Sequence, residues 1–228
     1  NGATLATLEV GAPATLTLPQ GQTMRLVFVG LGETGTPHFD NDLLGFRVGG
    51  GKLRKGNGDN VVSLASAVTD PRAVSLAPGR YRVLATRGLE YGVTQRELAL
   101  AAGEARALEI APPQRVIESP GWIGADLHVH SAESMDSALP LPQQLAAFAA
   151  QGGEVVVTTE HDRVVDARPL IAQLGLADRI VGVVGAEVTG TFHGGETPFT
   201  IGHLNAFPLL RARTAYRGGV PGSPLMTS

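Results

Sequence analysis

Histidines and carboxylates lie in the second half of the chain at spacings that suit a metal centre. His128 and His130 are two residues apart in an apolar segment. On a strand, both imidazoles leave the same face and can share one cation. His161 and Asp162 directly follow a second apolar segment, and Glu187 follows a third. Imidazole and carboxylate groups are the usual ligands of divalent transition metals, so the pattern predicts a metal site.

Two more residues extend this candidate set. Asp136 lies six residues beyond His130, in the loop that leaves the first predicted strand, and is placed to return to the same edge. His203 opens the last predicted strand. Among the carboxylates, Asp162 is the candidate for orienting or deprotonating a water molecule.

Each candidate also has an ordinary structural interpretation. Asp136 fits a turn or a helix N-cap, His203 fits a buried histidine with satisfied hydrogen bonds, and Glu187 fits an exposed strand end. His161 fits a solvated cluster with its charged sequence neighbours. Convergence of the side chains in space decides between a metal site and these alternatives.

The segments around the candidates alternate between strands and helices. Strands are predicted at Trp122–His130, Val155–Thr159, Ile180–Val184 and His203–Phe207, and helices at Leu141–Ala150 and Arg168–Leu174. Repeated strand–helix units predict a parallel sheet, either in a (β/α) barrel or in a doubly wound fold. The carboxyl ends of parallel strands meet at one edge, where the candidate residues are expected.

The first half of the chain has a different pattern, with short strands separated by turn signals. Examples are Met24–Val29, Val61–Leu64, Arg80–Thr86 and Ala105–Ile110. Alternation predicts that Tyr81, Val83 and Ala85 share one face of a strand. This spacing predicts an antiparallel β-sandwich. Pro112-Pro113 marks a linker, so the expected domains are residues 1–117 and 118–228.

Composition excludes several classes of function. The net charge of −3 gives no electrostatic footprint for nucleic acid, and the absence of cysteine excludes disulfides and a thiol nucleophile. No apolar run is long enough to span a membrane. Gly30–Gly35 matches the G-x-G-x-x-G dinucleotide pattern, but Pro37 opposes the helix that such a site needs. A glycine-rich hairpin loop is predicted there.

Four motifs, in order, resemble those of the PHP superfamily, the polymerase and histidinol phosphatase metallohydrolases. They are D-L-H-V-H-S from Asp126, T-E-H-D from Thr159, G-A-E-V from Gly185 and G-H-L-N from Gly202. The resemblance covers about residues 121–208. The β-rich segment before it is similar to that of the carbaryl-hydrolase-like (CehA/McbA) branch.

The resemblance implies a set of metal ligands and a fold. The implied ligands are His128, His130, Asp136, His161, Glu187 and His203. Glu187 would bridge two of two or three divalent ions (Zn, Mn or Fe). The implied fold is α/β plus all-β, with an N-terminal β-sandwich followed by a distorted (β/α)7 barrel. This barrel is expected to be incomplete, because the late histidine and D-x-H motifs of the family do not occur before Ser228.

Two details of the sequence bear on this resemblance. Glu160 stands where the family usually has aspartate, which is expected to alter the support of His161. The rival amidohydrolase family often carries a carbamylated lysine. The only lysines here, Lys52 and Lys55, lie in the β-rich half, which disfavours that family.

The leading functional expectation is a metal-dependent hydrolase that uses a metal-bridged hydroxide on small-molecule phosphate esters. Hydrolysis of a carbamate or carboxylic ester, and a non-catalytic metal-binding module, stay open as alternatives. The β-rich leading segment and the lack of cysteine fit an exported bacterial enzyme, periplasmic or extracellular, without excluding the cytoplasm. No oligomeric state is predicted.

Overall fold

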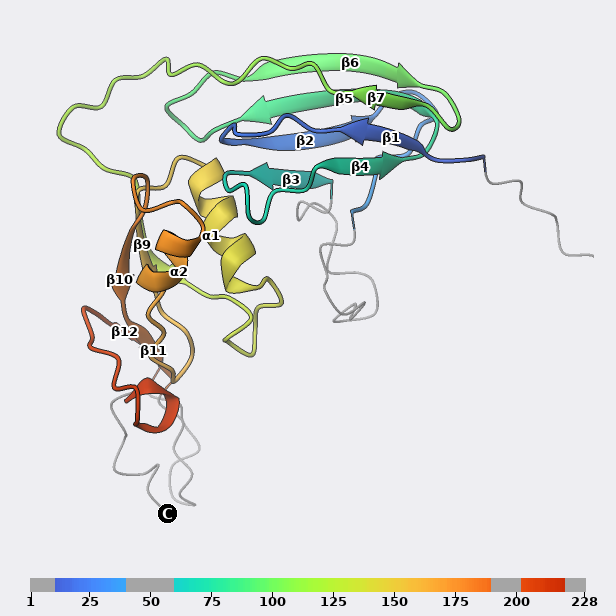
Figure 1. Ribbon diagram of the computed structural model, residues 1–228. Coiled ribbons are helices and arrows are strands. Elements are labelled where there is room, and N and C mark those ends of the chain that lie inside the picture. Colours follow the sequence, from blue (N-terminus) through green and yellow to red (C-terminus); the bar gives the residue numbers. More distant parts are fainter. Residues whose placement is uncertain (1–10, 40–59, 190–201, 220–228) are drawn as a thin grey trace, which may run out of the picture.

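The computed structural model describes residues 11–39, 60–189 and 202–219, and Figure 1 shows how they are arranged. Seven strands of the first half form two sheets. The four-stranded sheet has the order β3-β2-β5-β6, and the three-stranded sheet has the order β4-β1-β7. The strands are β1 (Ala14–Thr17), β2 (Met24–Gly30), β3 (Val61–Leu64), β4 (Ala73–Leu76), β5 (Gly79–Thr86), β6 (Thr94–Leu100) and β7 (Ala105–Ala107).

One apolar cluster is shared by the two sheets, and alternation along the strands builds it. In β5, Tyr81, Val83 and Ala85 are each at most 1% exposed, while the residues between them are only half-buried. This confirms the predicted face of the strand. After β2 ends at Gly30, Gly32 and Glu33 form a turn, and no helix follows between Thr34 and Phe39.

The second half contains a parallel sheet and two short helices. The sheet has the order β10-β9-β8, and both β8 and β10 run parallel to β9. An apolar cluster from β8, β9 and both helices, together with Ile180 just before β10, forms its core. The elements are β8 (Ala125–Val129), α1 (Leu141–Ala150), β9 (Val155–Thr158), α2 (Arg168–Gln173) and β10 (Val181–Val184). The chain continues through β11 (Ala186–Val188), β12 (Leu204–Ala206) and a 3-10 turn, η1 (Tyr216–Gly218).

Proline and glycine set the ends of the two helices. Pro142 lies in the first turn of α1, where its missing N–H costs no hydrogen bond. After α1, Gly152 adopts φ +76° and donates its N–H to the carbonyl of Ala149. Gly175 adopts φ +69° after α2, as its position after the apolar helix predicts.

The predicted (β/α)7 barrel is wrong for the described residues. A closed barrel gives every strand two neighbours, but β8 and β10 each pair with β9 alone. The predicted fourth strand, His203–Phe207, does not join this sheet. Instead, β12 pairs antiparallel with β11, which is separated from β10 only by Gly185. The parallel sheet therefore stays open and three-stranded.

The open sheet leaves β8 exposed as an edge strand. Its first four residues are exposed, and only Val129 is buried. Within this edge, the backbone N–H of His128 donates to the Asp126 carboxylate over 3.1 Å. The amide is thereby satisfied by a side chain of its own strand.

The two halves of the chain meet where α1 lies against β2 and β3 (Figure 1). Buried Ser66 donates its hydroxyl to the carbonyl of Leu174, the residue after α2 (2.7 Å). At Gly88, a Cβ atom would lie only 2.0 Å from the carbonyl oxygen of Gln151. The close approach of these backbones depends on that missing side chain.

A cleft of about 1140 Å³ lies at the same junction. Its walls come from β2, β3 and β4 on one side and from α1 on the other, and it extends to Asp136. Arg25 contributes a positive charge to its lining. None of the helices in the described ranges has the length and apolar content needed to cross a bilayer.

Candidate metal centre

The described chain brings six of the seven predicted site residues into three overlapping groups. In each group, one ligand atom per residue lies within 4.8 Å of the others. The groups are His128, His130 and Glu187; His130, Asp136 and His161; and His161, Glu187 and His203. This convergence favours a metal site over the separate structural interpretations of these residues.

The ends of the parallel strands position these side chains. His128 and His130 lie at the carboxyl end of β8, and His161 lies three residues after the neighbouring β9. β11 continues beside the segment after β9 in the register of the β9–β10 pair, and a parallel bridge places Glu187 beside His161. A Cβ atom at Gly185 would lie 3.0 Å from two carbonyl oxygens, so this close packing suits glycine. Convergence therefore arises without a closed barrel.

Backbone pairing fixes β11 beside the segment that carries His161. The N–H of Glu187 donates to the carbonyl of Glu160 (3.1 Å), and the N–H of Asp162 donates to the carbonyl of Glu187 (2.8 Å). His203 immediately precedes β12, the antiparallel partner of β11. These two backbone hydrogen bonds and the β11–β12 pair hold Glu187 in place. Its side chain lies between the residues at the carboxyl ends of β8 and β9 and His203.

Two imidazole nitrogens and one oxygen of Glu187 form a tight triangle of possible ligand atoms. The Nε2 atoms of His128 and His130 lie 2.8 Å from each other, and they lie 2.9 Å and 2.8 Å from Oε2 of Glu187. If both nitrogens carried hydrogens for Glu187, two N–H groups would face each other at contact distance. Lone pairs directed at a shared cation remove that conflict. The spacing is close to the about 3.3 Å between ligands of a tetrahedral ion.

The other oxygen of Glu187 faces a different imidazole. Nδ1 of His203 contacts Oε1, and Nδ1 of His161 lies 3.7 Å from Oε2. Glu187 is 3% exposed, whereas the side chains of His128 and His203 are each about half exposed. The carboxylate thus lies at the base of the cluster, and the histidines form its open side.

Asp136 lies on the remaining side of the cluster. Its carboxylate is 3.2 Å from Nε2 of His161 and 3.3 Å from Nδ1 of His130. The side chain is 52% exposed. Asp136 is therefore a ligand candidate that stays accessible to solvent.

The imidazoles lower the pKa of both carboxylates. Burial acts to raise the pKa of Glu187, but the hydrogen bonds from His128 and His203 and the charge of His161 outweigh it. Burial likewise acts to raise the pKa of Asp136, and the charge and hydrogen bonding of His130 and His161 bring it below its ordinary value. Both groups are thus held in the ionised form that binds cations.

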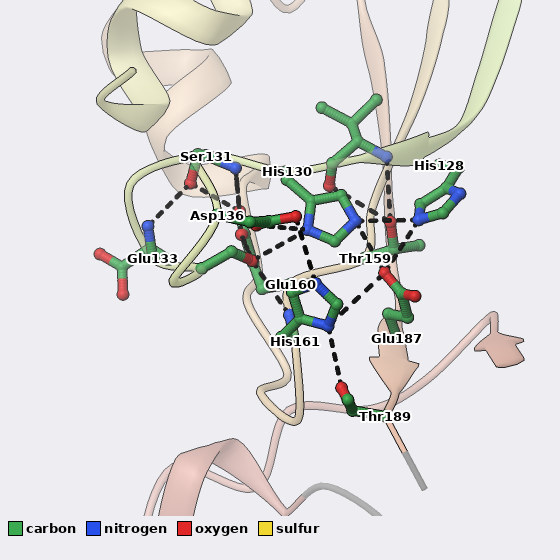
Figure 2. A network of polar contacts seen from close by, with 12 residues as sticks. His128, His130, Ser131, Glu133, Asp136, Thr159, Glu160, His161, Glu187 and Thr189 are labelled. Carbon is green, nitrogen blue, oxygen red and sulfur yellow. Dashed lines mark hydrogen bonds and ion pairs between the residues drawn. The ribbon is translucent and has the colours of Figure 1, made fainter. Parts of the chain in front are cut away.

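A buried polar layer supports the cluster (Figure 2). Glu160 is fully buried, and its carboxylate accepts the backbone N–H of Ser131 and the hydroxyls of Ser131 and Ser134. The hydroxyl of Ser134 also contacts Nδ1 of His130 (3.1 Å) and accepts the backbone N–H of His161 (3.0 Å). Support of this kind orients metal ligands.

Asp162 belongs to none of the three groups. It is 9% exposed, and its Oδ1 accepts the backbone N–H of Thr189 (3.0 Å). The hydroxyl of Thr189 in turn lies 2.9 Å from Nδ1 of His161. Asp162 therefore holds Thr189 in place, and Thr189 contacts the candidate ligand His161.

Sequence reasoning missed Ser131, Ser134 and Thr189. One signal was present for the two serines, because they lie three residues apart directly after the H-x-H strand, where a turn brings their hydroxyls together. No comparable signal pointed to Thr189. Its role depends on the parallel bridge between His161 and Glu187, which brings the end of β11 beside His161.

Comparisons with protein-family models, with curated proteins and with solved structures return no match for this chain. The donor set itself is therefore the test of which group fits. Four imidazoles and two carboxylates converge. Divalent transition metals suit such a mixture of nitrogen and oxygen ligands, whereas Mg²⁺ and Ca²⁺ prefer oxygen ligands alone.

Proposed function

We propose that this chain is a metal-dependent hydrolase of small-molecule phosphate esters. The observation that carries the proposal is the placement of Glu187. Its buried carboxylate turns Oε2 toward His128 and His130 and Oε1 toward His203. A carboxylate with its two oxygens facing separate sets of imidazoles is suited to bridge two cations.

Counting donor atoms supports two cations. The first group and the third group share only Glu187, which offers two oxygens. The middle group shares His130 with the first and His161 with the third, so it competes with both. We therefore assign one cation to His128, His130 and Glu187, and another to His161, His203 and Glu187. Zinc, manganese and iron all suit this donor set.

When bound, such cations supply Lewis acidity and lower the pKa of a coordinated water toward neutrality. The protein's residues contribute orientation and access. Glu187 is fixed from below by the backbone bonds of β11, whereas His128, His203 and Asp136 leave one side of the cluster open. A phosphate group approaching from that side meets both proposed cation positions, and these balance its negative charge.

The cleft beside the cluster supports a bound substrate. It reaches Asp136 at one end, and its volume of about 1140 Å³ exceeds that of a phosphate group alone. We therefore place the rest of the ester, the part that does not react, between α1 and strands β2–β4.

Metal depletion and reconstitution test the proposal. The protein is treated with a chelator, dialysed, and assayed with Zn²⁺, Mn²⁺ or Fe²⁺ on nitrophenyl phosphate, a bis-nitrophenyl phosphodiester and a nitrophenyl carbamate. We expect phosphate ester turnover to vanish with the metal and to return with it. Turnover that survives both chelation and the His130→Ala substitution contradicts the metal mechanism. Metal-dependent turnover of the carbamate alone contradicts the assigned substrate class.

A further inference from the structure

The hydroxyl of Ser134 contacts three groups at once. It lies 2.5 Å from Oε2 of Glu160, 3.0 Å from the backbone nitrogen of His161 and 3.1 Å from Nδ1 of His130. Ser134 is only 6% exposed and Glu160 is fully buried, so these contacts are sheltered from solvent. Bonds made in such surroundings are costly to leave unsatisfied.

A serine hydroxyl has one hydrogen to donate, and its neighbours determine where it goes. Both oxygens of Glu160 accept the backbone N–H of Ser131, and Oε2 also accepts the hydrogen of the Ser134 hydroxyl. The backbone N–H of His161 only donates, so it uses one lone pair of the Ser134 oxygen. The second lone pair faces Nδ1 of His130, which must then carry a hydrogen. The imidazole that results has its free lone pair on Nε2.

The position of this hydrogen matters because His130 is shared by two of the three candidate groups. Its Nε2 faces His128 and Glu187, whereas its Nδ1 is the nitrogen that lies 3.3 Å from Asp136. A nitrogen that carries a hydrogen cannot bind a cation. The tautomer of His130 therefore selects between the two groups.

We propose that Ser134, held by Glu160, is a positioning residue that commits His130 to the site formed with His128 and Glu187. The same contact withdraws His130 from the group that contains Asp136. The inference rests on the proposed metal centre, because it concerns which of its overlapping groups forms.

Asp136 is the competing acceptor for the Nδ1 hydrogen. Its oxygen is slightly farther from Nδ1 than the Ser134 hydroxyl, and its side chain is 52% exposed. Solvent competes for an exposed carboxylate and weakens its hydrogen bonds. Ser134 is therefore expected to dominate, and the two contributions are separable by substitution.

The test reads the tautomer directly, in metal-free protein labelled with ¹⁵N-histidine, by long-range ¹H–¹⁵N correlation. In the wild type, we expect the hydrogen of neutral His130 on Nδ1. Ser134→Ala should shift the ring toward the Nε2-protonated form, and Ser134→Thr, which keeps the hydroxyl, should restore the wild-type pattern. Ser131→Ala is the matched control, because it removes a hydroxyl from the same carboxylate without touching His130.

Two results overturn the inference. One is an Nε2-protonated His130 in the wild type, which decides the matter even if Ser134→Ala fails to fold. The other is a tautomer that changes with Asp136→Asn but not with Ser134→Ala. Because these spectra need neither metal nor substrate, they are independent of whether the protein hydrolyses any ester.

Metal binding provides a second measurement. In competition with a chromophoric chelator, Ser134→Ala should weaken the first equivalent of Zn²⁺ by about 10- to 100-fold, the usual effect of removing a hydrogen bond that orients a ligand. Ser131→Ala should weaken it less. The Co²⁺ absorption spectrum should change in Ser134→Ala and return in Ser134→Thr. Equal affinities and spectra in all these variants contradict the positioning role.

Discussion

Two imidazole nitrogens, Nε2 of His128 and Nε2 of His130, face each other over 2.8 Å, and without a cation only one of them can donate a hydrogen to the other. His128 and His130 cannot both donate to Glu187 without opposing their N–H dipoles, and a shared positive ion resolves the conflict. Because Glu187 is nearly fully buried, its charge also needs a partner in the folded state. At the scale of single residues, the cluster could therefore hold a metal ion.

Removing the charge of Glu187 tests this interpretation. Glu187→Gln keeps the shape of the side chain but replaces one bridging oxygen with an amide nitrogen. We expect both proposed cations to be affected, with Zn²⁺ affinity lowered by about 100-fold or more. Inductively coupled plasma mass spectrometry of the dialysed protein measures this loss.

Glu97→Gln is the matched control for that experiment. Glu97 forms a surface ion pair with Arg82 on the four-stranded sheet and is 47% exposed. Its substitution should leave the metal content unchanged. Equal metal retention in the two variants contradicts the role assigned to Glu187.

The sequence was sufficient to find the candidate ligands but not what supports them. The H-x-H spacing predicted that His128 and His130 leave the same face, because side-chain alternation on a strand is a local property. The predicted parallel sheet placed Glu187 near them, because the carboxyl ends of parallel strands meet at one edge. The contacts of Ser134 and Thr189 depend on loop conformations and on the pairing of β11 with the segment that follows β9. These are tertiary features that a local pattern does not contain.

At the scale of elements, the sequence predicted where strands form but not which strands pair with each other. The segment around His203–Phe207 does form a strand, β12, yet it pairs antiparallel with β11 rather than extending the parallel sheet. Apolar periodicity reports which residues are buried, but it does not report which neighbour buries them. This is why the elements were predictable, while the barrel into which they were placed was wrong.

The contact between the end of α1 and the loop before β6 depends on one glycine. Gly88→Ala would bring a Cβ atom within 2.0 Å of the Gln151 carbonyl oxygen, at a residue with φ +86°. We expect the free energy of unfolding to fall by roughly 2 to 4 kcal/mol, the sum of backbone strain and a forced shift of the helix end. Urea denaturation followed by circular dichroism measures the change.

Gly21→Ala is the control, because it introduces backbone strain without a steric clash. Gly21 also has a positive φ, +70°, but a Cβ atom there would meet nothing within 4 Å. We expect this variant to lose only about 1 kcal/mol. If Gly88→Ala costs no more than Gly21→Ala, the close approach to α1 does not stabilise the junction.

The start of α2 carries an ion pair with a defined pH dependence. Both oxygens of Asp166 accept hydrogen bonds from the guanidinium of Arg168, and this interaction lowers the pKa of the Asp166 carboxyl below its ordinary value of 3.8. On acidification the unfolded chain takes up this proton before the folded chain does. The stabilisation is thus complete above about pH 5 and is lost as the pH falls below about 4.

Thermal unfolding of Asp166→Asn at two pH values tests that dependence. At pH 7, we expect the Tm to lie about 1 to 3 °C below that of the wild type, a small effect because Arg168 is largely exposed. Near pH 3, the difference should shrink toward zero. Asp178→Asn is the control, since Asp178 is 77% exposed and its nearest contact with Arg179 is 3.9 Å. A difference for Asp166→Asn that grows at low pH has the wrong sign for this mechanism.

At the scale of the whole molecule, the cleft joins the β-rich half to the proposed metal centre. Its lining includes Ser75 of β4, an exposed residue on the wall opposite α1. If the cleft holds the non-reacting part of the ester, Ser75→Trp should raise KM about 10-fold while metal content and kcat stay near the wild-type values. Steady-state kinetics with nitrophenyl phosphate and with a bulkier aryl phosphate measures the effect.

The size of the substrate provides the internal control for that prediction. The bulkier ester should suffer the larger rise in KM, because it occupies more of the cleft. An equal change for both esters, or a fall in kcat alone, places the non-reacting group outside the cleft.

The hydrogen bond between Asp126 and the His128 amide has a consequence for solubility. An edge strand has unpaired N–H groups that can form hydrogen bonds with a strand of another molecule, including the same edge of a second copy. Such pairing between molecules leads to aggregation. In β8, the amide at His128 is already engaged, and the carboxylate that engages it repels a second copy of itself. One side chain thus makes this part of β8, beside the candidate metal ligands, less available for self-association.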